Sequence, residues 1–378
     1  MAMKIDREFE NFVSIIADLA SKAEKWDSRP AWIEYATNNI CNLECVMCSK
    51  ADGEPVMAMK KSDAEKVIGQ IFPFASVITP SANSEPLLGD MQFLAKMCKE
   101  HQVYFNIYSN ATILDGAKFE HIAPNTYKLW ISLDSHVPEI FEKIRVGADF
   151  ETVSRHVREI IPVAAKHRVP LGFVVVLMNE NAPILADFVD WVADISGPNR
   201  APDIRVQEML YNSEAAAKYD VNLQYTKDEI KGFIDQAAAR AKKRNVGLLC
   251  DLPGELWRHV PVETTEGHAP RGIGPEFLDK LIGTIEQKFP HFCSMASTYL
   301  KVNPDGAVFP CCRAPKELEM GNVLEKSVWE IWNGEKYRKF RKQMNCGDYP
   351  EVCSTCGVLV NNPHYQAKVK AKAKAEAQ

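Results

Sequence analysis

The stretch WIEYATNNICNLECVMCSK, residues 32–50, joins a short apolar run to three closely spaced cysteines. Its first part, residues 32–37, is rich in aromatic and β-branched side chains and predicts a β-strand. Cys41, Cys45 and Cys48 follow in the spacing C-x3-C-x2-C, so we expect them on the loop at the carboxyl end of that strand. In folds of parallel strands, this end of the sheet carries the reactive groups.

Five further segments have the pattern of strands, and apolar residues with helical spacing lie between them. The six predicted strands are residues 32–37, 76–79, 103–108, 129–133, 171–178 and 204–210. Regular alternation of strands and helices predicts a parallel sheet with right-handed crossovers. Six units are too few for a closed eight-fold barrel, so we expect an α/β fold, a partial (β/α)6 parallel barrel. A doubly wound sheet is the alternative.

The chain divides into five predicted parts. They are an N-terminal helix (1–30), the partial barrel (31–210), a connecting helix and loop region (211–290), a small cysteine-rich α+β domain (291–360) and a basic tail (361–378). Ser62 followed by Glu65 predicts a capping box at the start of a helix. In the connecting region we expect a helix near 227–243 and a loop at 253–275, which is rich in Pro, Gly and Thr.

Composition excludes several classes of protein. A formal net charge of -5 with 25% charged residues does not suit a nucleic-acid binder. The charged start MAMKIDREFENF does not have the apolar core of a secretory signal, and no run of about 18 apolar residues predicts a membrane span. We therefore expect a cytoplasmic protein whose partners include neither nucleic acid nor membrane.

The eleven cysteines are better suited to metal binding than to disulfides, because no secretory signal is visible and their spacings are tight. Three lie near residue 45 and six lie after residue 290, which predicts two separate sites. At the first site, three thiolates can hold three irons of a 4Fe-4S cluster and leave the fourth iron free to bind a small molecule. A structural zinc site fits less well, because it normally has four ligands.

On these residues the sequence resembles the radical S-adenosylmethionine (SAM) superfamily, from about Trp32 to Val358. The resemblance implies that the amino and carboxylate groups of SAM chelate the open iron of the cluster. An external one-electron donor such as flavodoxin or ferredoxin would then drive cleavage of SAM into methionine and a 5'-deoxyadenosyl radical, which takes a hydrogen atom from the substrate. Met47 departs from the family, which often has an aromatic residue before the third cysteine.

Two segments resemble family signatures after the second and third strands. Asn83-Ser84-Glu85-Pro86 stands where the family usually has Gly-Gly-Glu-Pro, and Ser109-Asn110-Ala111 stands where Thr-Asn-Gly is common. The resemblance implies that Glu85 helps to hold the methionine amino group and that Asn110 lies in the cofactor pocket. The alternative role for Glu85 is to cap a helix.

A third segment, Ile131-Ser132-Leu133-Asp134 followed by Arg145, resembles the signature of the fourth strand. There Ser132 would approach the ribose hydroxyls, and the planar guanidinium of Arg145 would pair with the methionine carboxylate. The alternative for Arg145 is a surface ion pair with Glu142. Asn179, at the end of the fifth predicted strand, is a weaker candidate for the same pocket.

The second group of cysteines surrounds a predicted hairpin. Residues 303–306, NPDG, are a turn signal between two short strands, 299–302 and 307–309. Cys311 follows this hairpin, Cys293 precedes it, and Cys353 and Cys356 form a later C-x2-C pair. Four such cysteines can make a zinc ribbon or an iron–sulfur site.

This segment also resembles the auxiliary-cluster modules called SPASM and twitch. The pattern Cys293, Gly306, Cys311 and the runs at 320–323 and 328–332 carry the likeness. Because no cysteine follows Cys356, the shorter twitch form is implied, with one auxiliary 4Fe-4S cluster on Cys293, Cys311, Cys353 and Cys356. Cys312 and Cys346 are alternative ligands or buried thiols. A fully ligated cluster is expected to relay electrons.

The resemblance implies an oxidoreductase that oxidises or epimerises a sugar, an aminoglycoside-like molecule or another natural product. A lone thiol, Cys250, is a candidate hydrogen-atom donor for epimerisation, and its alternative is a buried small hydrophobe. A maturase that modifies a ribosomal peptide or protein side chain is the alternative. Only about 30 residues precede the first strand and no leader-binding domain is visible there, which argues weakly against a maturase because such a domain can be a separate chain. A non-catalytic iron–sulfur or zinc scaffold is the competing class.

Overall fold

The computed structural model describes residues 2–81, 83–210, 213–252, 256–261, 273–360, 362 and 365–366. Its centre is an 11-stranded sheet with the order β11-β10-β9-β1-β2-β3-β4-β5-β6-β7-β8. The strands are β1 (Trp32–Tyr35), β2 (Val77–Thr79), β3 (Tyr104–Ser109), β4 (Thr126–Ser132), β5 (Leu171–Val176), β6 (Asp203–Gln207), β7 (Leu248–Asp251), β8 (Arg258–Val260), β9 (Tyr299–Val302), β10 (Ala307–Phe309) and β11 (Gly321–Asn322).

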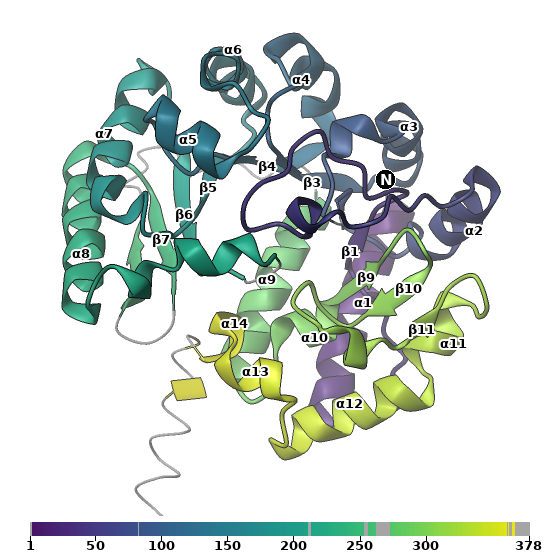
Figure 1. Cartoon of the computed structure of the whole chain (residues 1–378). Coiled ribbons are helices and arrows are strands. Elements are labelled where there is room, and N and C mark those ends of the chain that lie inside the picture. The colour runs from purple at the N-terminus through teal and green to yellow at the C-terminus, as the bar shows by residue number, and fades with distance from the viewer. Residues whose placement is uncertain are drawn as a thin grey trace, which may run out of the picture.

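The strand order confirms the partial barrel. Strands β1 to β7 are parallel and lie side by side in chain order, whereas a doubly wound sheet reverses its order at a switch point. The parallel run is longer than the six predicted strands, because β7 adds a seventh and β9 pairs in parallel with the outer side of β1. Figure 1 shows the helices along the outer side of this curved sheet.

The described helices follow the strands as the crossovers require. They are α1 (Ala2–Ala20), α2 (Lys61–Ile71), α3 (Met91–His101), α4 (Gly116–Ile122), α5 (Pro138–Ile144), α6 (Phe150–His167), α7 (Leu185–Ser196), α8 (Lys227–Arg244), α9 (Ile273–Lys288), α10 (Ser294–Thr298), α11 (Val328–Trp332), α12 (Glu335–Cys346), α13 (Glu351–Thr355) and α14 (Gly357–Val360). None of them is long and apolar enough to cross a membrane.

Three local expectations differ from the structure. The N-terminal helix ends at Ala20 rather than near residue 30. The capping box at Ser62 does not form, because α2 begins one residue earlier with Lys60 as its N-cap. The predicted loop 253–275 contains the short strand β8, which forms only because it pairs with β7, and the start of α9. Residues 253–255 and 262–272 of that loop, and most of the tail, lie outside the described residues.

The two faces of the sheet have different chemistry. Apolar residues at alternate positions, such as Ile33, Phe105 and Val206, are fully buried and share one core cluster with the helices. Successive residues of a strand point to opposite faces, so the residues between them line the inner face. Many of these inner residues are polar or aromatic, among them Glu34 and Arg205. The concave face of the sheet therefore carries the polar and aromatic side chains that could bind a ligand.

Helix α9 closes the amino end of the barrel. Leu278 packs against Ala31 and Val77, which lie at the amino ends of β1 and β2. At the start of β4, the Tyr127 hydroxyl donates a hydrogen bond to Asp279 Oδ1 of α9 at 2.5 Å. Because this end is filled, the polar inner face is open toward the carboxyl ends of the strands.

The structure predicts a specific role for Gly172. A Cβ at this position on β5 would lie 2.3 Å from Cζ3 of Trp130 on β4, so the ring of Trp130 lies flat against a bare backbone. We expect Gly172→Ala to lower the free energy of unfolding by about 1–3 kcal/mol through overpacking. Gly69→Ala, with nothing within 4 Å of the added Cβ in α2, is the control and should be neutral or stabilising. Denaturant unfolding followed by tryptophan fluorescence measures both, and equal midpoints would contradict the assignment.

Candidate functional site

The first cysteine cluster lies on the loop that follows β1, as expected. Two backbone hydrogen bonds, Glu44 N to Val146 O and Val46 N to Ile144 O, both 3.0 Å, hold this loop against the end of α5. The amide of Cys48 donates to the carbonyl of Cys45 at 2.9 Å and turns the chain back. The loop is thus fixed along most of its length before any cofactor binds.

The three thiols lie close together in a partly closed site. Burial raises the pKa of Cys41 and of Cys45, and the nearby Cys48 sulfur raises both pKa values further. Two N–H groups approach the sulfurs, with Arg145 Nη1 3.7 Å from Cys45 Sγ and Asn110 Nδ2 3.9 Å from Cys41 Sγ. Three sulfurs with N–H donors beside them suit an iron–sulfur cluster, whose properties depend on such hydrogen bonds.

Glu85 connects the loops that follow the first three strands. Its carboxylate is 1% exposed and accepts hydrogen bonds from Ser109 Oγ at 2.9 Å and from the Asn110 amide at 2.7 Å. Its own amide donates to the carbonyl of Ile40 at 2.9 Å. Burial raises the pKa of Glu85, and these hydrogen bonds oppose the rise. Glu85 also accepts from Leu87 N at the start of a short 3-10 helix, so the capping role predicted as its alternative is present.

Two of the three residues that replace family glycines keep the backbone shape that glycine allows. Asn83 has φ of 50° and Ala111 has φ of 56°, both in the left-handed region. Asn adopts this region more readily than other side chains, whereas Ala at such a position costs about 1–2 kcal/mol. The chain therefore maintains a strained conformation at Ala111, directly after Asn110.

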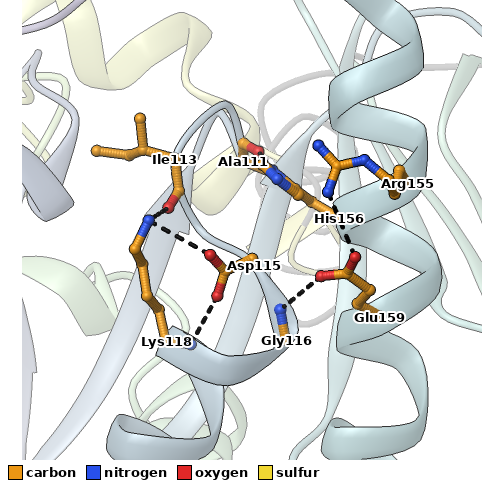
Figure 2. Close-up of polar contacts among 8 residues, drawn as sticks. All are labelled: Ala111, Ile113, Asp115, Gly116, Lys118, Arg155, His156 and Glu159. Carbon is orange, nitrogen blue, oxygen red and sulfur yellow. Dashed lines mark hydrogen bonds and ion pairs between the residues drawn. The ribbon is translucent and has the colours of Figure 1, made fainter.

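The loop that carries Asn110 is anchored by α6, as Figure 2 shows. His156 Nδ1 lies 2.8 Å from the carbonyl oxygen of Ala111, so this nitrogen must carry the proton and donate. Glu159 Oε2 accepts from the amide of Gly116 at 3.2 Å, and Asp115 caps α4 by accepting from Lys118 N at 2.7 Å. These contacts stabilise the segment that follows Asn110.

Arg145 lies beside the cluster site and pairs with Asp134. Its Nε donates to Asp134 Oδ2 at 2.5 Å, and the two side chains are 11% and 0% exposed. Asp134 Oδ1 accepts from the amide of Val176 at 2.8 Å, which fixes the carboxylate between β4 and β5. The surface pair with Glu142 does not form, because Glu142 accepts from Phe150 N instead. Asp134 belongs to the segment that suggested Arg145, but sequence analysis assigned no role to Asp134.

The remaining predicted cofactor contacts are placed differently. Ser132 is the last residue of β4 and lies at the expected end of the sheet. Asn179 Nδ2 donates to the carbonyl of Lys218 at 3.1 Å, so its side chain binds the following loop. The buried amide in this region is Asn181, which donates to the carbonyls of Asp134 and Val176 at 3.0 and 2.9 Å. Sequence analysis missed Asn181, whose only signal was its proximity to the end of a strand.

The inner face of the sheet has a polar cluster that the sequence did not reveal. Lys301 Nζ lies 3.2 Å from Glu34 Oε1, and the Tyr299 hydroxyl donates to the same carboxylate. Across the barrel, Arg205 Nη2 lies 2.7 Å from Asp251 Oδ2. The polar residues alternate with apolar ones along the strands, and this alternation was the missed signal.

An aromatic surface lies between these two ion pairs. The rings of Tyr108 and Trp130 stack with centroids 6.2 Å apart and an interplanar angle of 14°. Both come from inner positions of neighbouring strands, β3 and β4. Together with the ion pairs, this surface makes the inner face suitable for a polar ligand with a flat or ring-shaped part.

Cys250 faces away from this inner cluster. The thiol is 0% exposed and belongs to the core under the helices, together with Val206, its partner on β6. Burial raises the pKa of Cys250 to about 12. The residue that follows it, Asp251, has the opposite orientation and pairs with Arg205. The structure therefore favours the buried-hydrophobe interpretation of Cys250 over a hydrogen-atom donor.

The second cysteine group surrounds one pocket. Its lining includes all four predicted ligands and Cys312, and the complete lining is Cys293, Met295, Cys311, Cys312, Arg313, Val352, Cys353, Cys356, Val358 and Leu359. Burial raises the pKa of Cys293 to about 12 and that of Cys353 to about 11, and neighbouring thiols add to both shifts. No three metal-binding side chains converge on a single-ion position within the described residues. The pocket holds five thiols, and the four predicted ligands among them fit a cluster with one cysteine for each iron.

The two alternative ligands have different positions. Cys346 ends α12, is exposed and does not belong to the pocket lining. Cys312 lines the pocket and is also solvent-accessible. Glu34 and Lys301 of the inner polar cluster both act electrostatically on Cys312. Cys312 therefore lies between the auxiliary pocket and the inner face of the barrel.

Comparisons with known proteins agree with this arrangement. Residues 293–357 match the SPASM family, an iron-sulfur cluster-binding domain. The chain therefore carries a SPASM domain at these residues. The matched segment lies inside the predicted 291–360, and the rest of the chain supplies the three-cysteine loop and the parallel sheet.

Individual relatives of this protein are distant. A probable GTP 3',8-cyclase from Methanococcus maripaludis is 22% identical over 306 residues, covering 79% of this chain and 89% of the relative. The fold is similar to that of anSMEcpe with bound AdoMet, with a TM-score of 0.58, 16% identity and coverage of 87% and 85%. SuiB from Streptococcus suis gives a TM-score of 0.58 and 16% identity, with coverage of 91% of this chain and 74% of that chain.

The buried pair of Arg145 and Asp134 yields a stability prediction. Asp134→Ala leaves the guanidinium without its carboxylate in a site that is almost closed to water. We expect the free energy of unfolding to fall by about 3–5 kcal/mol. Glu180→Ala removes the partner of Lys143 in a more exposed ion pair and should cost only about 0–1 kcal/mol. Similar losses for the two variants, measured by urea denaturation, would show that the Arg145 pair is not buried in solution.

Proposed function

We propose that this enzyme binds a SAM-cleaving 4Fe-4S cluster through Cys41, Cys45 and Cys48 and an auxiliary 4Fe-4S cluster through Cys293, Cys311, Cys353 and Cys356. The observation that carries the proposal is the fixed loop after β1, where three thiols meet the N–H groups of Arg145 and Asn110. When bound, these groups supply a 5'-deoxyadenosyl radical from SAM for hydrogen abstraction and an auxiliary one-electron acceptor. The bound AdoMet of anSMEcpe supports the SAM assignment.

Side chains at the carboxyl ends of the strands would orient the cofactor. Arg145 is held by Asp134 and directed at Cys45, so it offers a fixed positive charge for the methionine carboxylate. Glu85 holds the loops that carry Cys41 and Asn110 in register. Ser132 lies at the carboxyl end of β4, where a ribose hydroxyl would have to approach. Asn179 is proposed as a cofactor contact only because it lies close to the carboxyl end of β5.

We infer that the substrate binds on the inner face of the barrel, next to both clusters. The pairs Glu34–Lys301 and Arg205–Asp251 offer charges for polar groups, and Tyr108 with Trp130 offers a flat surface for a ring. These features suit a sugar, an aminoglycoside-like molecule or a similar polar natural product. Because α9 fills the amino end, such a substrate would enter from the carboxyl ends of the strands.

Within this class, oxidation is favoured over epimerisation. Epimerisation needs a hydrogen-atom donor on the far side of the substrate, and Cys250 lies in the core instead. Oxidation needs a base, and Glu34 is a carboxylate on the inner face that already accepts a hydrogen bond from Tyr299. Glu34 also acts electrostatically on Cys312 of the auxiliary pocket, so proton and electron acceptors would be neighbours. A cytoplasmic flavodoxin or ferredoxin is the proposed electron donor.

A peptide substrate is the second candidate. SuiB bound to its precursor peptide SuiA has a TM-score of 0.59 to this chain, with coverage of 91% of this chain and 73% of that chain. A structure of anSMEcpe with the Cp18Cys peptide has a TM-score of 0.57. Both proteins have a fold similar to this chain over most of its length, so the same inner face could take a side chain of a peptide.

The two-cluster assignment is tested by anaerobic reconstitution. We expect about eight irons per chain and release of 5'-deoxyadenosine when SAM and dithionite are added. Cys41→Ala should leave about four irons and abolish release of 5'-deoxyadenosine, whereas Cys311→Ala should remove the auxiliary cluster only. Cys346→Ala is the control and should keep all the iron, because its thiol lies outside the pocket. Release of 5'-deoxyadenosine by Cys41→Ala, or about four irons in the unmodified protein, would overturn the assignment.

The substrate class is tested with extracts of the source organism. If the substrate is small, the low-molecular-weight filtrate should stimulate 5'-deoxyadenosine formation, and the dialysed macromolecular fraction should not. Arg205→Gln, which removes a cation from the inner face, should reduce this stimulation but keep the background release without substrate. Stimulation by the macromolecular fraction alone would favour the peptide candidate. Stimulation that is unchanged in Arg205→Gln would place the substrate elsewhere.

A further inference from the structure

Arg341 on α12 is a charged side chain with no exposed surface. Its relative exposure is 0%, and no carboxylate pairs with it among the described residues. Nη1 makes two long hydrogen bonds, to the carbonyl of Glu24 at 3.3 Å and to Asn333 Oδ1 at 3.5 Å. Nε and Nη2 have no hydrogen-bond partner in the structure. The positive charge is therefore almost uncompensated by direct contacts.

Three aromatic rings enclose the guanidinium instead. Its central carbon lies 4.2 Å from the ring centroid of Trp26, 4.5 Å from that of Trp332 and 5.1 Å from that of Tyr337. Aromatic faces attract cations, and this attraction is stronger where water is excluded. Burial lowers the pKa of Arg341 to about 9, which still leaves the group charged at neutral pH.

A buried charge without a counterion is unfavourable for folding, and an apolar residue of similar volume would often be tolerated or better there. The carboxylate of Asp18 raises the pKa of Arg341 electrostatically. It accepts a hydrogen bond from the amide of Ser28, however, and does not pair with the guanidinium. The position thus keeps a cation in an environment that disfavours it. Such a charge acts over long distances, because water does not screen it.

The aromatic cage connects Arg341 to two of the auxiliary thiols. The ring of Trp26 contacts that of Phe292 at 5.7 Å, and Phe292 precedes Cys293 in the chain. The hydroxyl of Tyr337 donates to the carbonyl of Phe309 at 3.5 Å, two residues before Cys311. Cys311 also acts electrostatically on Tyr337. Arg341 is therefore linked to the auxiliary pocket through the rings of Trp26 and Phe292 and through the contact of Tyr337 with Phe309.

We propose that the buried cation of Arg341 raises the reduction potential of the auxiliary cluster and so makes it a better acceptor of the substrate's electron. This inference rests on the proposed function, which places that cluster on Cys293, Cys311, Cys353 and Cys356. Reduction adds one electron to the cluster, and a nearby buried positive charge stabilises the reduced form more than the oxidised form. Cluster potentials respond to surrounding charge and to burial.

The test is a redox titration of the reconstituted holoenzyme, followed by electron paramagnetic resonance of each cluster. Arg341→Met removes the charge and should shift the auxiliary potential to a more negative value, whereas Arg341→Lys should keep most of it. The first cluster serves as an internal reference whose potential should not move. Lys342→Met removes the next cation on the same helix, which is 67% exposed, and should leave both potentials unchanged.

A second variant tests the charge effect without replacing Arg341, in case Arg341→Met does not fold. Asn333→Asp keeps Arg341 and places a carboxylate beside Nη1, so it should also lower the auxiliary potential. An unchanged auxiliary potential in Arg341→Met and Asn333→Asp, with all the iron retained, would overturn this inference and leave the proposed function intact. Loss of the auxiliary cluster from the unmodified protein would instead overturn the proposed function.

Discussion

The arrangement of this protein depends on the position of β1 between β2 and β9. The first pairing starts the parallel barrel, and the second attaches the hairpin of the auxiliary domain to the same sheet. The loop after β1 leaves the sheet beside Val302, at the carboxyl end of the strand, whereas β10 runs antiparallel to β9 and carries Cys311 back toward the amino end. The two groups of cysteines are thus placed by one set of backbone hydrogen bonds.

Burial divides the sheet into a structural face and a chemical face. The outer face is apolar and packs on the helices, where most of the hydrophobic stabilisation arises. The inner face can be polar because α9 seals one end and ion pairs compensate the charges, as in Arg205–Asp251 and Glu34–Lys301. Cys250 and Asp251 illustrate this division. They are neighbours on β7, but the thiol of Cys250 lies in the core and the carboxylate of Asp251 lies on the inner face.

Both cluster sites place a buried arginine near thiols, but by different means. Arg145 is paired with Asp134, so an ion pair fixes the direction of its guanidinium toward Cys45. Arg341 is surrounded by Trp26, Trp332 and Tyr337, which attract the cation without cancelling its charge. The ion pair orients the N–H donors of Arg145 at the first cluster site. The aromatic rings around Arg341 leave its positive charge uncancelled near the auxiliary site.

The sequence alone determined the class of fold, the three-cysteine loop, the hairpin before Cys311 and the helix at Lys227–Arg244, because these depend on local spacing, turn chemistry and periodicity. It could also indicate Arg145 and Glu85 by resemblance. It could not reveal that Arg145 pairs with Asp134 rather than Glu142, that β9 joins β1, or that Cys250 faces the helices. Only the tertiary structure decided these, because they depend on which strand lies beside which and on the face that each side chain occupies. The same reason applies to Arg341, whose aromatic neighbours Trp26 and Trp332 are far apart in the chain and meet only when the N-terminal segment packs on the auxiliary domain.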